Sequence, residues 1–477
     1  MMSPLPDNLP DAHDLIIELV AENARLKRER EELIVEKAHL EETLEEQRKA
    51  GKRQAHPFRR SENRRIPPSD HKKPGRRKGK GTFTRRPTPE QADEEFRIPL
   101  NACPHCGNSA LPAERKKLIN WQIDAPPIQP VVTCFHTEGC ICPQCNIWIQ
   151  SRHPRQLSTA MGAANITFGP RLIAIAADLH EHLGISYEKI EDLLGCAFGF
   201  DLERSSLCKA VDRLLKQAEP IYTQLIELIR RSSVVHADET GWRIGILNAW
   251  LWTFTNKEAT VYEIRSGEGA RGHGVVVDIL GRQFAGVLVS DCFAAYDVKL
   301  FDNWLKQKCL AHFLRAFADL RDDSKAAVLS FALEVIDHLK SAIALARRRD
   351  SGPPSDYQHQ CTRLEEDFDA LLKRNASITD EVATRLLNRL LKQRKHLFTF
   401  LYHPDLPYDN NQAERDLRPA VVIRKTQGCN KTSQGARKHV VLTSISATLR
   451  KQNRSPIDFY TRLQYTDASM PAITAPS

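Results

Sequence analysis

The 477-residue sequence has no apolar run of about 18 residues or more, the length needed to cross a bilayer, so it predicts no membrane span. Its first residues, MMSPLPDNLPDAHD, place acids early and lack the basic-then-apolar pattern of a signal peptide, and secretion is therefore not expected. A disulfide framework is also disfavoured. Four of the twelve cysteines form two Cys-Pro-x-Cys pairs and the others are scattered, which favours a reducing cytosol with free thiols and bound metal.

The net charge of +9 is unevenly distributed along the chain. Residues 51–86 contain fourteen Lys or Arg and only two acids, so the rest of the chain is slightly acidic. One concentrated basic arm favours a polyanion as partner, although a solvated linker has the same composition. Few apolar groups are available for burial between residues 50 and 98, and we expect an arm that orders on its partner. The candidate anion contacts in this arm are Lys72, Lys73, Arg76, Arg77, Lys78 and Lys80.

A leucine repeat marks the predicted helix at residues 14–49. Its leucines recur at seven-residue steps, at Leu19, Leu26, Leu33 and Leu40. This spacing is typical of a coiled coil that pairs two chains, but Arg30 and Lys37 fall on the other position of the seam and weaken it. Self-association and packing of the helix on its own protein both remain open.

Residues 99–155 are predicted to form a small cysteine module. Its two pairs are Cys103 with Cys106 and Cys142 with Cys145. Four thiolates suit one tetrahedral Zn²⁺. Because the spacer between the pairs is longer than in compact zinc ribbons, Cys134, His136 and Cys140 remain open as substitute ligands. A redox pair is disfavoured, since neither pair opens a helix after a strand.

The rest of the chain predicts a mixed α/β protein. Residues 156–231 are mostly helical by pattern, and two segments in them, ISYEKIEDLLG and LERSSLCKAVDRLLKQ, suit two short helices around a turn, as in a helix-turn-helix. A region from 232 to 425 begins with β-branched and aromatic runs. These predict strands at 232–238, 249–255, 259–265 and 285–291, with a helix near 274–280. Helices dominate from about 311 to 400 and again from 426 to 466.

Two acids end predicted strands. Asp238 closes the run VVHAD, and Asp291 closes AGVLVSD. If these strands are neighbours, the two carboxylates lie a few ångströms apart and repel unless a cation lies between them, and hard oxygen ligands favour Mg²⁺ or Mn²⁺. Adjacent side chains of a strand point to opposite faces, so only one of Asp238 and Glu239 can join Asp291. Aspartate also ends strands simply as a turn residue, and for either acid alone this alternative remains open.

A third acid, Glu414, is predicted on a helix that begins within YDNNQAERDLRP. Asp409 or Asn410 can cap this helix, and Gln412 completes a capping box if Asp409 is the cap. Glu414 then lies about one turn into the helix.

Two basic residues share roughly one helical face with Glu414. Arg418 follows it by four residues and Lys425 by eleven, but Pro419 must kink or restart the helix between them. A carboxylate flanked by basic groups suits a metal ion that faces a phosphodiester. A surface Glu–Arg pair is the alternative.

Long stretches of the sequence, in order along the chain, resemble the transposases of insertion sequence family sixty-six, which are bacterial enzymes of the DDE type. These stretches are the leucine repeat, the arm KKPGRRKGKG, CPHCG (103–107), CPQC (142–145), HADETGWR (236–243), SDCFAAYD (290–297), CLAHFLRAF (309–317), NNQAERDLRP (410–419) and NRSPIDFYTRL (453–463). The resemblance covers nearly the whole chain and is far more specific than three acids alone.

The resemblance implies a fold and a reaction. The fold is α/β, a ribonuclease-H-like catalytic core with a large helical insertion, preceded by a coiled coil, a basic arm and a zinc-finger-like module. The implied catalytic triad is Asp238, Asp291 and Glu414, which would hold two divalent ions, Mg²⁺ or Mn²⁺. The reaction is cleavage of DNA strands at the ends of an insertion sequence, followed by strand transfer. We find no tyrosine or serine motif that demands a covalent protein–DNA intermediate.

The resemblance also implies binding residues. His312 and Arg315 match recurring positions of the family and would contact substrate phosphate near the metal ions, although a packed histidine beside an exposed arginine explains them equally well. Arg418 and Lys425 join them as candidate DNA contacts. A structural Zn²⁺ is implied for the cysteine module.

The implied partner is DNA, both element ends and target, with no membrane. We also expect a homo-oligomer formed through the coiled coil, accessory transposition proteins, and a location in the bacterial cytoplasm at the nucleoid. Two alternatives remain: a non-catalytic DNA-binding protein derived from a transposase, and another ribonuclease-H-like nuclease. The intact acids argue against the first, and the basic arm with its four-cysteine module argues against the second.

Overall fold

The computed structural model describes residues 87–109, 112, 118–125, 129–157, 167–322, 326–350 and 353–465, together with residues 22, 25 and 26. The predicted coiled coil at 14–49 therefore lies outside the described residues, apart from these three. So do the six candidate anion contacts of the basic arm, from Lys72 to Lys80. The chain divides into two compact units, Met1–Ile123 and Asp124–Ser477.

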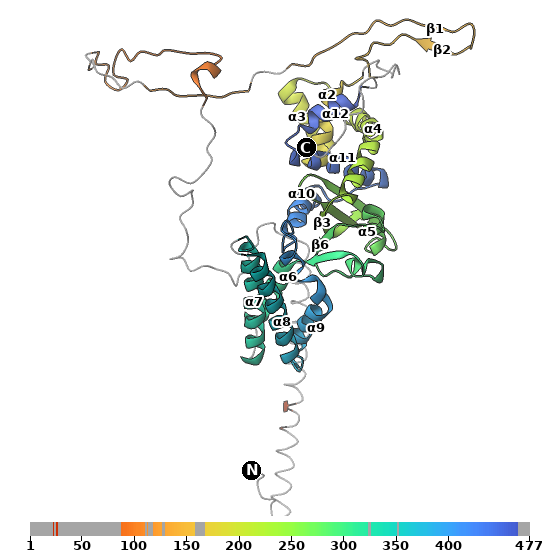
Figure 1. Ribbon diagram of the computed structural model, residues 1–477. Coiled ribbons are helices and arrows are strands. Elements are labelled where there is room, and N and C mark those ends of the chain that lie inside the picture. The colour runs from red at the N-terminus through yellow and green to blue at the C-terminus, as the bar shows by residue number, and fades with distance from the viewer. Residues whose placement is uncertain are drawn as a thin grey trace, which may run out of the picture. The chain divides into compact units, whose positions relative to one another are not determined.

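A five-stranded mixed sheet forms the centre of the second unit (Figure 1). Its strands lie side by side in the order β5 (Thr260–Ser266), β4 (Leu247–Thr255), β3 (Val234–Ile244), β6 (Val287–Ser290) and β7 (Leu305–Lys308). The pairs β5–β4 and β4–β3 are antiparallel, whereas β3–β6 and β6–β7 are parallel. This arrangement confirms a mixed α/β fold.

The four strands expected from the sequence are present, and two features of the sheet differ from expectation. β3 continues past Asp238 to Ile244, because β4 pairs with it through a hairpin that closes at Ile244 and Leu247. The fifth strand, β7, was not predicted. Its sequence LKQK is polar, yet Lys306, Gln307 and Lys308 are buried. Their polar groups find partners inside the protein, and a hydropathy pattern cannot indicate such a strand.

One face of the sheet shares a hydrophobic core with a group of helices. These are α2 (Pro170–Ala177), the π-helical turn η4 (Asp178–His182), α3 (Tyr187–Phe198), α4 (Arg204–Arg230), α5 (His273–Leu280), α11 (Ser433–Lys451) and α12 (Pro456–Leu463), of which α4 and α11 contact β5. Trp252 and Phe254 of β4 and Leu288 of β6 are fully buried in this core. α4 is a single long helix, so the second of the two short helices expected here is much longer than its pattern indicated.

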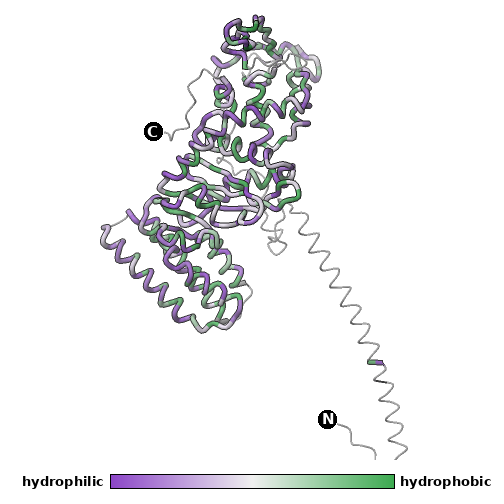
Figure 2. The backbone as a smooth tube through the Cα atoms, turned by 90° about the vertical axis from the view of Figure 1, so that its right-hand side faces the viewer, coloured by the Kyte–Doolittle hydropathy of each residue, from purple (hydrophilic) through white to green (hydrophobic). Residues whose placement is uncertain are grey.

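The other face contacts the helices that lie between Asp291 and Glu414 in sequence. They are α6 (Leu310–Asp322), α7 (Ala326–Arg347), α8 (Pro354–Arg374) and α9 (Glu381–Gln393). Their core includes Val287 and Val289 of β6, which anchor the helices to the sheet. The helices alternate between hydrophilic and hydrophobic stretches along their length (Figure 2), as expected of helices with one buried face.

α10 (Asn411–Gln427) lies on the same face as α6 and carries Glu414. It packs on Trp242 and Leu251 of the β3–β4 hairpin through Leu417 and Ala420. The remaining short elements are β1 (Gly139–Ile141), β2 (Trp148–Gln150), η3 (Pro89–Gln91), η5 (Ala294–Tyr296), η6 (Lys299–Phe301), η7 (Arg394–His396) and η8 (Thr399–Leu401). Among the described residues, no helix combines the length and apolar character that a membrane crossing requires.

Candidate active site

Asp238 and Asp291 lie on neighbouring parallel strands. The register of β3 and β6 pairs His236 with Val289, and two further residues along each strand bring Asp238 level with Asp291, the residue that follows β6. Neighbouring strands are about 4.8 Å apart, so the two carboxylates share one edge of the sheet. The sequence predicts that Asp238 ends its strand, but β3 continues beyond it to Ile244. Asp238 does lie where β3 loses its pairing with β6.

Glu239 is directed away from Asp238, to the opposite face of the sheet. Its side chain is only 4% exposed. It accepts hydrogen bonds from the Tyr296 hydroxyl at 2.9 Å and from Arg271 Nη2 at 3.3 Å, and Tyr296 belongs to the core on that face. Asp238, in contrast, lies on the same side of β3 as Trp242, against which α10 packs. The alternation of the strand therefore separates the two acids as expected.

Burial and crowding of acids perturb Asp238. Its pKa is raised to about 7, first by burial and then by the negative charges of Glu239 and Asp291, while the backbone amide of Glu239 opposes the shift. The negative charge of Glu414 raises the pKa of Asp238 further, so the third acid lies within electrostatic reach of the first. Acids gathered in this way could hold a hard divalent cation, whose charge would offset their repulsion.

Asn410 fixes the start of α10 beside Asp238. Its side chain is 1% exposed and bridges two groups of β3: Oδ1 lies 3.1 Å from His236 Nδ1, and Nδ2 donates to the Ala237 carbonyl at 2.8 Å. The backbone amide of Glu414 donates to the Asn410 carbonyl at 3.2 Å. Glu414 is therefore placed one helical turn from a residue that is bonded to the strand of Asp238.

The capping box expected at this helix is not formed. Asn410 is the N-cap, yet its side chain makes no capping bond because it is used for the contacts with β3. Asp409 Oδ1 accepts from the amide of Asn411 at 3.2 Å, and Gln412 Nε2 donates to the Asn256 carbonyl at 2.5 Å. Tertiary contacts have replaced the local ones that the sequence allowed.

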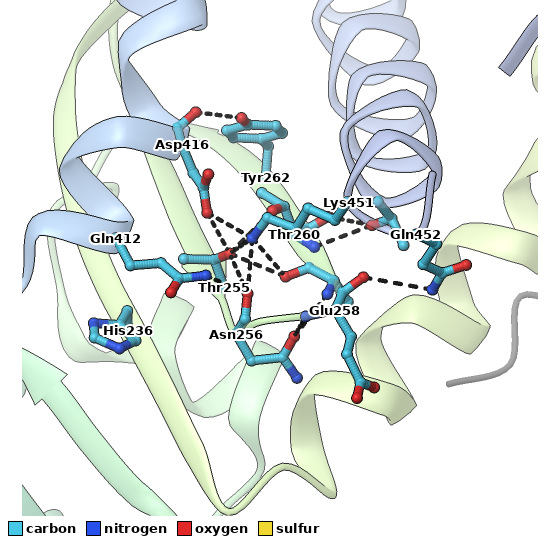
Figure 3. Close-up of polar contacts among 12 residues, drawn as sticks. His236, Thr255, Asn256, Glu258, Thr260, Tyr262, Gln412, Asp416, Lys451 and Gln452 are labelled. Atoms are coloured by element: carbon cyan, nitrogen blue, oxygen red, sulfur yellow. Dashed lines mark hydrogen bonds and ion pairs between the residues drawn. The ribbon is translucent and has the colours of Figure 1, made fainter. Parts of the chain in front are cut away.

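A partly buried ion pair holds α10 on the sheet two residues after Glu414 (Figure 3). Lys451 Nζ, at the end of α11, lies 2.6 Å from Asp416 Oδ2 and donates to Thr255 Oγ1 at 2.5 Å and to the Asn256 carbonyl at 2.8 Å. Tyr262 Oη donates to the Asp416 carbonyl at 2.5 Å. Three segments distant in sequence thus meet behind the helix that presents Glu414.

His312 lies beside Glu414, with Nε2 at 3.7 Å from Glu414 Oε1. Cys309, His312 and Glu414 offer ligand atoms that all lie within 4.8 Å of one another. Among the described residues, Glu414 Oε1 and His312 Nδ1 are buried without a hydrogen-bond partner. Two unsatisfied buried polar atoms in one cluster fit a site that binds a cation or a substrate group. Cys309 itself is buried and accepts from the Asn410 amide through its sulfur at 3.2 Å.

The remaining basic candidates are exposed. Arg315 on α6 and Arg418 and Lys425 on α10 all lie at the surface. α10 continues through Pro419, so of the two expected outcomes, a kink or a restart, the restart does not occur. The three side chains are free to reach a ligand outside the protein.

Lys308 was missed by sequence reasoning. It is fully buried on β7 and lies 2.7 Å from Asp297 Oδ1. Its ammonium group also donates to the Asp291 carbonyl at 3.0 Å and to Ser290 Oγ at 3.2 Å. A lysine in the run LKQK has no sequence signal for this role, because the signal is the burial that only the folded chain creates.

The two cysteine pairs have the same local structure. In each pair the first cysteine carbonyl accepts from the residue after the second cysteine at 2.9 Å, and that residue, Gly107 or Asn146, has a positive φ. Backbone amides of each turn lower the pKa of its first cysteine. The amide of Cys106 has the largest effect on Cys103, and the amide of Cys145 has the largest effect on Cys142. Such turns present a thiolate pair as zinc knuckles do. Cys103 and Cys106 belong to the first unit and Cys142 and Cys145 to the second.

The fold and the acidic cluster define a mixed α/β protein with carboxylates gathered at a sheet edge. The sequence model described as "Transposase IS66 family" matches residues 165–438, more than half of the chain, and these residues include all three acids. The chain therefore belongs to the IS66 family of transposases, as the resemblance of its motifs indicated. Membership of this family implies DNA as the partner.

No curated protein sequence matches the chain. Among solved structures, the crystal structure of the catalytic domain of Mos1 mariner transposase is similar over 42% of this chain and 94% of that chain, at 16% sequence identity and a TM-score of 0.14. Because this superposition is weak, the family assignment rests on the sequence match.

Proposed function

We propose that the protein cleaves DNA at the ends of an insertion sequence and joins the 3′ ends to target DNA, with Asp238, Asp291 and Glu414 as the catalytic acids. The observation that carries this proposal is the convergence of the three acids, from two parallel strands and a distant helix, within one electrostatic cluster. The strand order, with three antiparallel strands followed by two parallel ones, supports a ribonuclease-H-like core with the helices α6–α9 inserted before Glu414.

The three acids would hold two divalent ions, Mg²⁺ or Mn²⁺, and the unsatisfied Oε1 of Glu414 supports this ligand set. The ions would supply activation of the attacking water or 3′-hydroxyl and stabilisation of the leaving oxygen. The protein itself holds the acids rigidly. Lys308 fixes the end of β6 at Asp291, and Asn410 with the Asp416–Lys451 pair fixes α10 at Glu414.

The basic residues around the acids would bind the DNA backbone. His312 Nε2 lies 3.7 Å from Glu414 Oε1, and the partly exposed imidazole supports a contact with substrate phosphate beside Glu414. Arg315, Arg418 and Lys425 are exposed on α6 and α10, the two helices that meet at this cluster. The arm residues from Lys72 to Lys80 would add phosphate contacts that position the protein without reading sequence.

The cysteine module would bind one structural Zn²⁺ through Cys103, Cys106, Cys142 and Cys145, and the matching turns of the two pairs support this. The leucine repeat at 14–49 would pair two protomers so that two DNA ends are held together. Accessory transposition proteins and a place of action at the bacterial nucleoid complete the proposal.

Strand transfer from labelled element ends, with Mg²⁺ present, tests the proposed reaction. We expect the wild-type protein to join 3′ ends to a target, and we expect Asp238→Asn, Asp291→Asn and Glu414→Gln to abolish joining while end binding remains largely intact. Each substitution removes a charge that holds cations and keeps the size of the side chain. A variant that transfers strands normally would remove its residue from the triad.

The same assay separates the two alternatives. Cleavage without joining would indicate another nuclease of this fold. Binding without cleavage by the wild-type protein would indicate a non-catalytic DNA-binding protein.

A further inference from the structure

Arg271 is held between two aromatic rings at the edge of the sheet that carries the catalytic acids. Its guanidinium carbon lies 4.0 Å from the ring centre of Trp250 and 4.1 Å from that of Phe293. The side chain nevertheless remains 48% exposed. Contacts with the two rings hold the guanidinium in place, and its exposed part leaves N–H donors that can reach a ligand outside the protein.

Two of the residues that contact Arg271, Phe293 and Glu239, lie next to the proposed catalytic acids in sequence. Phe293 follows Asp291 by two residues, and its backbone amide donates to Asp291 Oδ1 at 2.9 Å. Glu239, the residue after Asp238, accepts from Arg271 Nη2 at 3.3 Å. Arg271 is thus tied to the middle of β3, beside Asp238, and to the end of β6, beside Asp291.

The loop that carries Arg271 is also fixed. It follows β5, which runs parallel to β3 and β6, so it leaves the sheet at the edge where Asp291 lies. Gly267 and Gly269 adopt positive φ angles of 82° and 75°, which allow two successive tight turns. The buried Trp252 indole donates to the Ala270 carbonyl at 2.9 Å, directly before Arg271.

Neutralisation of Glu239 does not account for this arrangement. Tyr296 already donates to the second oxygen of Glu239, and Arg271 offers only one of its five N–H donors, at a long distance, to the first. A half-exposed, planar and ring-stacked guanidinium with spare donors has the geometry that binds phosphate oxygens in two places at once.

We propose that Arg271 donates hydrogen bonds to a DNA phosphate next to the scissile one and positions that strand on the side of the site opposite Glu414. This inference rests on the proposed function and extends its substrate contacts to the Glu239 face of the sheet, whereas the contacts proposed for α6 and α10 lie on the Glu414 face. A strand held between this arginine and the residues of α6 and α10 is clamped from both sides.

The first test compares Arg271→Ala and Arg271→Lys in the full-length protein. The probe is a labelled duplex that carries the terminal inverted repeat flanking the gene. Loss of a charge-assisted contact should lower the cleavage rate in Mg²⁺ by about 10- to 100-fold for Arg271→Ala. Lysine should restore only part of the rate, because it lacks the planar fork. Arg282→Ala removes an exposed arginine before the start of β6, at the other edge of the sheet, and should leave the rate unchanged.

The second test shows whether the contact is with a phosphate. Single phosphates near the cleavage position are replaced by neutral methylphosphonates, and equilibrium binding is measured in Ca²⁺. At one position the replacement should weaken DNA binding of the wild-type protein by about 10-fold or more. The same replacement should weaken DNA binding of the Arg271→Ala variant less than about 2-fold, because this variant has already lost the contact. A purely structural role for Arg271 would leave the two losses independent at every phosphate, and that result would overturn the proposal.

Failure of the two proposals can be told apart. If Asp238→Asn cleaves the ends as fast as the wild-type protein, the catalytic assignment is wrong. The methylphosphonate measurement of binding then still decides the role of Arg271. If the wild-type protein cleaves and Arg271→Ala cleaves and binds equally well, only the proposal for Arg271 is overturned.

Discussion

Individual buried polar residues decide how rigidly the acids are held. The most informative of these is Lys308, whose fully buried ammonium group faces Asp297 and the carbonyl of Asp291. Gln393 of α9 donates to the other oxygen of Asp297 at 2.5 Å, so one lysine links the end of β6 to the inserted helices. Removal of one partner from a buried ion pair destabilises the protein by more than the intact pair stabilises it. The reason is that the remaining partner stays buried and charged without a counterion.

We predict that Lys308→Met lowers the free energy of unfolding by roughly 3–5 kcal/mol. Methionine fills the space but leaves Asp297 buried and unpaired. Chemical denaturation measures the change, and Lys299→Met, at an exposed lysine nearby, is the matched control and should change stability little.

The double variant Lys308→Met/Asp297→Asn should recover much of the loss, because the uncompensated charge is then removed. Equal destabilisation of the single and double variants would show that the ion pair is not the reason for the burial of Lys308.

At the level of elements, α10 illustrates how the position of one side chain, Glu414, is set by contacts of the helix that carries it. The N-terminus is bonded to β3 through Asn410, and the middle is clamped by Asp416 and Lys451 (Figure 3). Glu414 lies between these two attachments. Burial lowers the pKa of Lys451, and the carboxylate of Asp416 opposes this shift, so the charge of the lysine depends on its partner.

We predict that Lys451→Met speeds amide hydrogen exchange in α10 and lowers the rate of DNA cleavage, because Asp416 loses its counterion and the helix its clamp. Exchange is followed by mass spectrometry on peptides from α10, and peptides from α8, which lies in the inserted helices, serve as the internal control. Lys451→Arg keeps the charge and should behave more like the wild type. Unchanged protection of α10 in Lys451→Met would contradict the clamp.

At the level of the whole molecule, the chain divides its tasks among segments that are separate in sequence. The sheet has one core with α4 and α11 on one face and another with α6–α9 on the other face. Asp291 and Glu414 are separated by the whole of the second core, so the site forms only when both cores have folded.

We predict about one Zn²⁺ per chain, measured by elemental analysis of the purified protein. Changing Cys142 and Cys145 together to Ser should release the metal and impair folding or DNA binding, because two ligands of a tetrahedral site are then absent. Changing Cys134 and Cys140 to Ser should leave the zinc content unchanged. Loss of zinc in this second variant would move the ligand set to the substitute residues.

The sequence by itself determined the acids and the elements that carry them. Continuous β-branched and apolar runs predict the strands of Asp238 and Asp291, and the alternation of side chains along a strand separates Asp238 from Glu239, because both signals lie in neighbouring residues. The motifs identified the family for the same reason: they are continuous stretches that can be compared letter by letter.

Only the tertiary structure decided how these residues are supported. β7, Lys308 and the ring-held Arg271 had no local signal, and the capping box at α10 gave way to contacts of Asn410 and Gln412 with other strands. In each case a polar group is satisfied by a partner far away in sequence. The free energy of such a contact exists only after the backbone has brought the two groups together and removed water from between them, so no window of neighbouring residues can reveal it.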